Sequence, residues 1–249
     1  MNAQNISAEC LKELVKVANN AALKAGTYLR DNKNLDKEIY LEKGRDIKLE
    51  IDRNSEKIIY EELKGTKISF LGEEFGLKKE SEDGLLWVVD PLDGTSNYFR
   101  GIDQCCVSIA LMQNESPLLG VIYNFNSNDV YYASKGNGAY LNDIKIKVSS
   151  ISDKSSASLT TGFPASEKTK NTLDFLGDLS KWKKIRMFGS AALSCAYVAS
   201  GKCDVYLEKG IYLWDIAAGI CLVEEAGGKV KKELLQNDQY SIEMSNGIL

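Results

Sequence analysis

The sequence predicts a protein with an α+β half and an α/β half, and three observations support this fold class. Residues 1–148 contain two amphipathic helical patterns and then a series of short strands, an order typical of α+β folds. In residues 149–249 strands and helices alternate, which is typical of α/β folds. No repeat, low-complexity tract or flexible linker separates the halves, so we expect them to pack as one unit.

The first half begins with two predicted helices. Apolar residues recur at three- and four-residue steps from Leu11 to Ala25, which predicts a helix over residues 7–31 with Ser7 as its cap. A second helix is predicted over residues 52–64, opening with Asp52 and closing at Gly65. The charged stretch 41–46 between them contains a glycine and is predicted to be a mobile loop.

Apolar runs bounded by turn residues place the remaining elements. In the first half they predict a mostly antiparallel meander, turned by Gly136 and Gly138, with strands over residues 68–71, 85–89, 105–112, 118–123, 130–133 and 144–148. In the second half the predicted order is strand 157–161, helix 166–181, strand 185–188, helix 190–200, strand 205–207 and helix 215–226.

Composition limits the class of protein. The 249 residues include 31 Lys and Arg against 35 Asp and Glu, a net charge of −4, with 44% hydrophobic residues. This is the composition of an ordinary globular protein, and its mild acidity argues against binding to nucleic acid or to an anionic membrane surface. No secretory signal or apolar run of about 18 residues is present, so we expect a cytoplasmic protein.

The chain contains no histidine. This excludes Ser-His-Asp and Cys-His catalysis, histidine-ligated zinc and an imidazole base. The six cysteines form no C-x-x-C pair and mostly lie in apolar runs, so we expect buried free thiols in a reducing compartment. Catalysis would therefore depend on carboxylates, hydroxyls, lysines, thiols or metal ions bound by oxygen.

Acidic residues follow the predicted ends of three elements. Glu73 and Glu74 close one strand, Asp90 and Asp93 close the apolar strand 85–89, and Asp215 opens a helix. Taken singly, these acids could be a solvated turn, turn dipeptides and an N-cap. If they converge, however, their mutual repulsion requires cations, and about two Mg²⁺ ions would balance four carboxylates. A phosphate monoester could then enter as a further ligand.

The segment after Asp93 could hold the phosphate. Gly94 lets the backbone approach closely, and Gly94-Thr95-Ser96-Asn97 would lead into a helical turn with free N–H groups. The Thr95 hydroxyl could orient an attacking water. Walker A, dinucleotide-binding and nucleophile-elbow motifs are absent, and the spacing of Asp90 and Asp93 does not match an EF-hand.

These motifs resemble the inositol monophosphatase family of Mg²⁺-dependent, lithium-sensitive sugar-phosphate phosphatases, over nearly the whole chain. The matching strings are Gly72-Glu73-Glu74, Trp87-Val-Val-Asp90-Pro-Leu-Asp93-Gly94-Thr95-Ser-Asn97-Tyr, Gly189-Ser190-Ala191-Ala192, Trp214-Asp215-Ile-Ala-Ala-Gly219 and Glu225-Ala-Gly-Gly228. The resemblance implies the layered αβαβα sandwich of the inositol monophosphatase and fructose bisphosphatase type, and a homodimer.

The resemblance also implies roles for individual residues. One metal would be held by Glu73, Asp90 and the backbone carbonyl of Leu92. A second would be held by Asp90, Asp93 and Asp215, and Glu73 with water molecules could hold a third. Thr95 would pair with Asp52, which is otherwise a plain N-cap, to assist the attacking water. Glu74 would be a nearby carboxylate that contacts the metal ligands but not the metal.

A substrate wall follows from the same resemblance. Glu208 matches the position that binds sugar hydroxyls, and Gly162, Phe163 and Ala191 would line the same wall. Arg186 resembles a basic residue of microbial relatives, or else is a surface charge. Asn97-Tyr98 resembles the inositol phosphatase branch, whereas the nucleotide bisphosphate branch usually has Lys-Glu there. Lys43 falls where the family has a basic residue near the third metal, but its spacing to Asp46 is shorter than in animal relatives.

The sequence therefore predicts a Mg²⁺-dependent phosphomonoesterase that acts on inositol monophosphate or a related small sugar or polyol phosphate. The mechanism requires no histidine, in agreement with the composition. Two alternatives remain: a fructose bisphosphatase or other sugar-phosphate phosphatase, and a non-catalytic metal-binding regulatory protein of the same fold.

Overall fold

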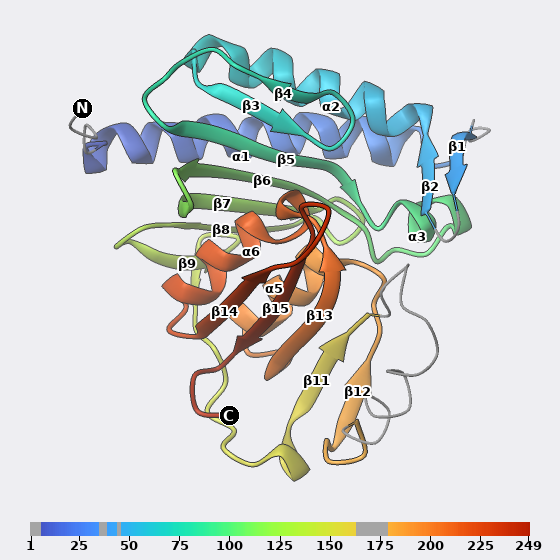
Figure 1. Ribbon diagram of the computed structural model, residues 1–249, viewed down its shortest axis with the longest axis vertical. Coiled ribbons are helices and arrows are strands. Elements are labelled where there is room, and N and C mark those ends of the chain that lie inside the picture. The colour runs from blue at the N-terminus through green and yellow to red at the C-terminus, as the bar shows by residue number, and fades with distance from the viewer. Residues whose placement is uncertain (1–5, 35–38, 44–45, 163–178) are drawn as a thin grey trace.

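The computed structural model describes residues 6–34, 39–43, 46–162 and 179–249 (Figure 1). Its centre is an eight-stranded sheet with the order β10-β9-β8-β7-β6-β5-β3-β4, antiparallel except where β3 and β5 run parallel. These strands are β3 (Ser69–Gly72), β4 (Gly76–Lys78), β5 (Leu85–Asp93), β6 (Cys106–Gln113), β7 (Ser116–Asn124), β8 (Asp129–Ser134), β9 (Gly138–Leu141) and β10 (Ile144–Ile146).

Two long helices, α1 (Ala8–Asp31) and α2 (Glu50–Leu63), cover one face of this sheet (Figure 1). The predicted first helix is confirmed, because the Ser7 side chain caps α1 by accepting a hydrogen bond from the Cys10 N–H at 3.2 Å. The predicted start of the second helix was wrong: α2 begins at Glu50, so Asp52 is its third residue and not its N-cap.

A second layer of helices, α5 (Ala191–Ala199) and α6 (Leu213–Glu225), lies between the central sheet and a five-stranded sheet (Figure 1). That sheet has the order β12-β11-β13-β15-β14, and only β11, β12 and β13 are parallel. Its strands are β11 (Ser158–Thr161), β12 (Lys184–Arg186), β13 (Val205–Ile211), β14 (Lys229–Leu234) and β15 (Tyr240–Ser245). The layered mixed fold is as predicted, while most of the predicted helix 166–181 lies outside the described residues.

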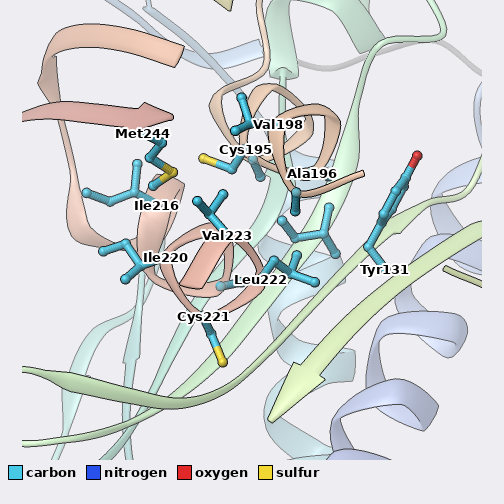
Figure 2. Close-up of a cluster of buried hydrophobic side chains, with 14 of the residues drawn as sticks. Tyr131, Cys195, Ala196, Val198, Ile216, Ile220, Cys221, Leu222, Val223 and Met244 are labelled. Carbon is cyan, nitrogen blue, oxygen red and sulfur yellow. The ribbon is translucent and has the colours of Figure 1, made fainter. Parts of the chain in front are cut away.

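The sheet separates two hydrophobic clusters by simple alternation along its strands. On β6, Val107, Ile109 and Leu111 are fully buried against the α1 and α2 side. Cys106, Ala110 and Met112 point to the opposite side and join the cluster around α5 and α6. Figure 2 shows this second cluster, where Cys195, Ala196 and Val198 of α5 meet apolar side chains of α6.

Several predicted boundaries needed correction. Stretch 41–46 was predicted to be a loop, but Ile39–Lys43 and Asp46–Leu49 pair as antiparallel strands β1 and β2. Strands β4, β9, β14 and β15 had not been predicted. Further short elements within the described residues are α3 (Thr95–Arg100) and the 3-10 turns η1 (Lys64–Thr66) and η2 (Lys154–Ser156). Across the described ranges, no helix combines the length and apolar character needed to cross a membrane.

Candidate functional site

The site gathers acids from three separate segments of the chain. Glu73 follows β3, and its N–H donates to the Val89 carbonyl of the parallel neighbour β5 at 3.2 Å. This pairing brings Glu73 beside Asp90. Burial, together with the negative charges of Glu73, Asp93 and Asp215, raises the pKa of Asp90 well above its usual range. The structure therefore places the four predicted acids in one neighbourhood.

A β-bulge at the end of β5 turns Asp90 and Asp93 to the same side. Asp90 pairs with Ser108 and Asp93 with Cys106, so three steps along β5 match two steps along β6. In a regular strand, residues three apart point to opposite faces, and one extra residue restores the same face. The Leu92 N–H donates to Asp90 Oδ1 at 2.9 Å and stabilises this irregular turn.

Asp93 is held by the beginning of α5. Its carboxylate accepts hydrogen bonds from the Ala192 N–H at 2.9 Å, the Ala191 N–H at 3.2 Å and the Ser190 hydroxyl. Burial raises the pKa of Asp93, and these bonds partly oppose the shift. Because α5 belongs to the second half of the chain, Asp93 joins the two halves at the site.

Asp215 comes from the first turn of α6. The alternative prediction, in which Asp215 is only the N-cap of a helix, was wrong, because Asp215 is the third residue of α6. Its carboxylate accepts a hydrogen bond from the Tyr212 N–H at 2.7 Å. Burial and the charges of Asp93 and Glu73 raise the pKa of Asp215 well above its usual range. An acid from the second half thus faces the acids of β3 and β5.

The candidate phosphate segment begins with a left-handed residue. Gly94 has a φ of 88°, and a Cβ there would lie 2.7 Å from the Gln104 carbonyl oxygen, so glycine is required. The Thr95 hydroxyl donates to the Leu92 carbonyl at 3.0 Å. Asp52 is buried, and its carboxylate accepts a hydrogen bond from the Leu49 N–H at 2.7 Å. The pairing of Asp52 with Thr95 stays a prediction.

The candidate substrate wall includes a buried acid on β13. Glu208 accepts a hydrogen bond from the Tyr206 hydroxyl at 2.8 Å, and a Cβ at Gly162 would lie 2.2 Å from its Oε1. Burial raises the pKa of Glu208 to about 7; the Tyr206 bond lowers it, and the charge of Asp93 raises it further. Glu208 therefore lies close to the acidic cluster.

The other predicted wall residues are placed differently. Ala191 touches the cluster through its N–H bond to Asp93. Arg186 is exposed on the edge strand β12, where its charge lowers the pKa of the Cys203 thiol against the effect of burial. Phe163 lies outside the described residues, and Lys43 is described only as the last residue of β1.

Comparisons with known proteins show the family to which this chain belongs. The model of the inositol monophosphatase family matches residues 10–235. The chain belongs to the inositol monophosphatase family. It is 42% identical over 228 residues to the Nus factor SuhB of Xylella fastidiosa, covering 88% of this chain and 82% of that protein.

Two further relatives show how far the family likeness extends. Inositol monophosphatase 2 of Saccharomyces cerevisiae is 38% identical over 203 residues, which cover 74% of this chain and 69% of that protein. The crystal structure of the extragenic suppressor protein suhB from Bartonella henselae superimposes on this chain with a TM-score of 0.89, and the match covers 95% of each chain. The two sequences are 34% identical.

The acids of this inositol monophosphatase family member suit a divalent cation by their chemistry. Carboxylate and carbonyl oxygens are the ligands that Mg²⁺ prefers, and a cation would relieve the repulsion that raises the pKa of Asp90 and Asp215. Within the described ranges, however, no three acids form a closed metal-binding group. Asp90, Asp93 and Asp215 each accept backbone N–H groups in this structure.

Sequence reasoning missed one acid beside the site of this family member. Glu56 on α2 has no exposed surface, and its carboxylate accepts the N–H groups of Glu74 and Phe75. A weak signal existed, because Glu56 falls in the helical stripe that also contains Ile59 and Leu63, where apolar residues are expected. Tyr206, which binds Glu208, was missed as well. Ser190 belongs to a string that resembles the family, but its hydrogen bond to Asp93 was not predicted.

Proposed function

We propose that this protein is a Mg²⁺-dependent phosphomonoesterase that hydrolyses inositol monophosphate or a related small sugar or polyol phosphate. The observation that carries the proposal is the gathering of Glu73, Asp90, Asp93 and Asp215, in which the charges of Glu73 and Asp93 raise the pKa of both Asp90 and Asp215. Membership of the inositol monophosphatase family supports phosphatase chemistry. The absence of histidine from the chain is compatible with such a mechanism.

The acids have separate roles in this proposal. Glu73, Asp90 and the Leu92 carbonyl would hold one cation, Asp90, Asp93 and Asp215 a second, and Glu73 with water molecules could hold a third. When bound, Mg²⁺ supplies charge neutralisation and activation of water. Glu74, whose N–H donates a hydrogen bond to Glu56, would lie next to the cation ligands without binding a cation itself.

Residues of β5 and α3 would position the phosphate and the attacking water. Gly94 and Thr95 stand at the start of α3, where backbone N–H groups have no partner within the helix and can bind phosphate oxygens. The Thr95 hydroxyl donates to the Leu92 carbonyl and can therefore accept a hydrogen bond from the water, which it would orient toward phosphorus. Asp52 would assist Thr95 in this role.

The sugar would bind against β13 and the start of α5. Glu208, fixed by the Tyr206 hydroxyl and by the close approach of Gly162, would accept hydrogen bonds from substrate hydroxyls. Ala191 would contact the same ring, and Phe163 and Arg186 would complete the wall. We further propose that the protein works in the cytoplasm as a homodimer, without binding a membrane.

Two alternative functions rest on specific observations. The same acids would serve a fructose bisphosphatase or another sugar-phosphate phosphatase, because only the wall decides the sugar. A regulatory protein is suggested by the 42% identical relative that is named Nus factor SuhB. Such a role would add a macromolecular partner, whereas the net charge of −4 argues against direct binding of nucleic acid.

Phosphate release from a panel of esters tests these functions. We expect release from inositol monophosphate that requires Mg²⁺ and stops with EDTA, slower release from fructose 1,6-bisphosphate, and little from adenosine bisphosphate. The Asp215→Asn variant should lower kcat by at least about a hundredfold, since it removes a proposed ligand. Tight Mg²⁺ binding without release from any ester would instead favour the regulatory role.

A further inference from the structure

A buried carboxylate grips the turn that carries Glu73. Glu56 Oε2 accepts the Glu74 N–H at 2.8 Å, and Oε1 accepts the Phe75 N–H at 2.7 Å. Each oxygen therefore binds one of two successive backbone donors. Glu56 itself has no exposed surface and lies on helix α2, which packs on the sheet.

The turn is built around this side chain. Gly72 ends β3 opposite Gly76 of β4, and a Cβ at Gly72 would lie 2.3 Å from Glu56 Oε1. Only a glycine at this place lets the strand approach the carboxylate so closely. The backbone of Glu73 is thereby bounded by Gly72 on one side and by the anchored Glu74 on the other, and its own N–H is bound to Val89 on β5.

Packing alone does not account for a glutamate at this position. Burial and the negative charges of Glu73 and Glu74 disfavour its charged form, and the two turn N–H groups oppose them. An apolar residue would fill the same space on the buried face of α2 without this penalty. What the carboxylate adds is the attachment of the turn.

We propose that Glu56 is a positioning residue: by binding the N–H groups of Glu74 and Phe75, it holds the turn so that the Glu73 carboxylate stands beside Asp90 for cation binding. This inference rests on the proposed function, because it assumes that Glu73 is a cation ligand. Glu56 itself would contact neither cation nor substrate.

The first test is cation binding by the Glu56→Gln variant. Calorimetric titration with Mn²⁺ and Mg²⁺, without substrate, should show about tenfold to a hundredfold weaker binding, the usual effect of losing a residue that orients a metal ligand. Glutamine keeps one acceptor but presents an amide N–H₂ group to the other donor. The Mg²⁺ concentration for half-maximal phosphate release should rise in parallel. Unchanged cation affinity in a folded variant would overturn the inference.

Glu225 offers a matched control. On α6 it binds the Gly136 and Gly138 N–H groups at 2.8 and 2.7 Å, the same grip on a different turn. It lies ten residues beyond Asp215, about 15 Å along the helix. Glu225→Gln should leave cation affinity unchanged, although it disturbs the same kind of paired hydrogen bonds at a half-buried carboxylate. An equal loss of affinity in this variant would trace the effect to general destabilisation and overturn the inference.

A shorter acid separates position from charge. Glu56→Asp keeps the negative charge but is one methylene too short to reach both donors, so we expect it to weaken cation binding as Glu56→Gln does. Wild-type affinity in Glu56→Asp would show that only the charge matters, which contradicts the proposal.

A measurement on the unmodified protein covers the case in which the variants do not fold. The Glu74 and Phe75 amide hydrogens should exchange slowly, as buried and bonded groups do, and rapid exchange typical of a free turn would overturn the inference. The proposed function fails separately: cation binding that depends on Glu56 without any phosphate release would refute the phosphatase and leave the positioning role intact.

Discussion

Asp90 and Asp93 stand three residues apart on β5, but different neighbours hold them. Asp90 Oδ1 accepts one backbone N–H, from Leu92. Both oxygens of Asp93 accept donors, from Ser190, Ala191 and Ala192. An asparagine can replace Asp90 and keep the Leu92 bond, whereas at position 93 its N–H₂ group would face a donor in either orientation.

We therefore expect Asp90→Asn to stabilise the protein in EDTA. The variant replaces a buried carboxyl group whose pKa is raised by burial and by three neighbouring acids. The free energy of unfolding in EDTA should therefore rise. Phosphate release should nevertheless fall by at least about a hundredfold, because a proposed cation ligand is lost.

Urea unfolding and phosphate assays, with Asp93→Asn in parallel, check this expectation. Asp93→Asn should lose stability in EDTA as well as activity, because it breaks the attachment to α5. A destabilised Asp90→Asn protein would mean that the acids do not repel one another in the folded state.

The Glu208 carboxyl makes stability depend on pH. Its folded pKa is raised from 4.5 to about 7, chiefly by burial. Between these values the folded protein holds a proton that the unfolded chain has lost, so the free energy of unfolding falls as pH rises from 4.5 through 7. Above that window the penalty is complete and constant.

Glu208→Gln should remove this contribution. In EDTA, the stability of the variant relative to the unmodified protein should increase between pH 5 and pH 8, while its amide oxygen can still accept the Tyr206 hydroxyl. Denaturant unfolding at both pH values measures the difference. A stability difference that is the same at pH 5 and pH 8 would show that Glu208 titrates normally.

At the scale of elements, the sequence predicted what local pattern determines. The stripe from Leu11 to Ala25 is buried on α1 as expected, and the apolar strand 85–89 is the core of β5. Two of the missed strands carry weak patterns. β4 has three residues, two of them Gly76 and Lys78, and β14 is a charged edge strand. Neither needs an apolar run, because little of its surface is buried.

In the candidate site, too, local sequence patterns predicted some features and contacts between distant segments determined the others. The acids could be located from the sequence, because they follow apolar strands or open a helix. The bulge that turns Asp90 and Asp93 to one side depends on pairing with β6, and the grip of Glu56 on the 73–75 turn depends on packing between α2 and β3. Such contacts between distant segments leave no local pattern, so only the structure reveals them.

The contact between β7 and α6 yields a prediction at this scale. A Cβ at Gly120 would lie 2.4 Å from the Ala218 carbonyl oxygen, and this neighbour is helix backbone that cannot turn aside. Gly120→Ala should therefore separate the sheet from α6 and reduce the free energy of unfolding by about 1–3 kcal/mol, the usual cost of overpacking.

Gly65 provides the control for this substitution. It has no atoms within 4 Å of the added methyl group, and its φ is not in the left-handed region. Gly65→Ala should leave stability unchanged or raise it by about 0.4–1 kcal/mol through a less flexible unfolded chain. Thermal or urea unfolding of both variants is the measurement, and equal stabilities of the two would contradict the close contact of β7 with α6.

At the scale of the whole molecule, the acids join the central sheet of the first half to α6 of the second half. Glu73 directly follows a strand of the central sheet and Asp90 and Asp93 lie on another, whereas Asp215 lies in the first turn of α6, which packs between the two sheets. A cation held by all of them exists only in the folded state, because the unfolded chain keeps these segments apart. Ligands of this kind stabilise a protein by mass action.

Mg²⁺ should therefore raise the melting temperature of the unmodified protein, and a concentration one hundred times the Kd should add about 2.7 kcal/mol to the free energy of unfolding. EDTA should reverse the effect, and K⁺ at equal ionic strength should not reproduce it. In Asp215→Asn the gain should shrink, because the central sheet no longer shares its cation with α6. If Mg²⁺ stabilises this variant as much as the unmodified protein, the cation does not bridge the two parts, and Asp215 is not among its ligands.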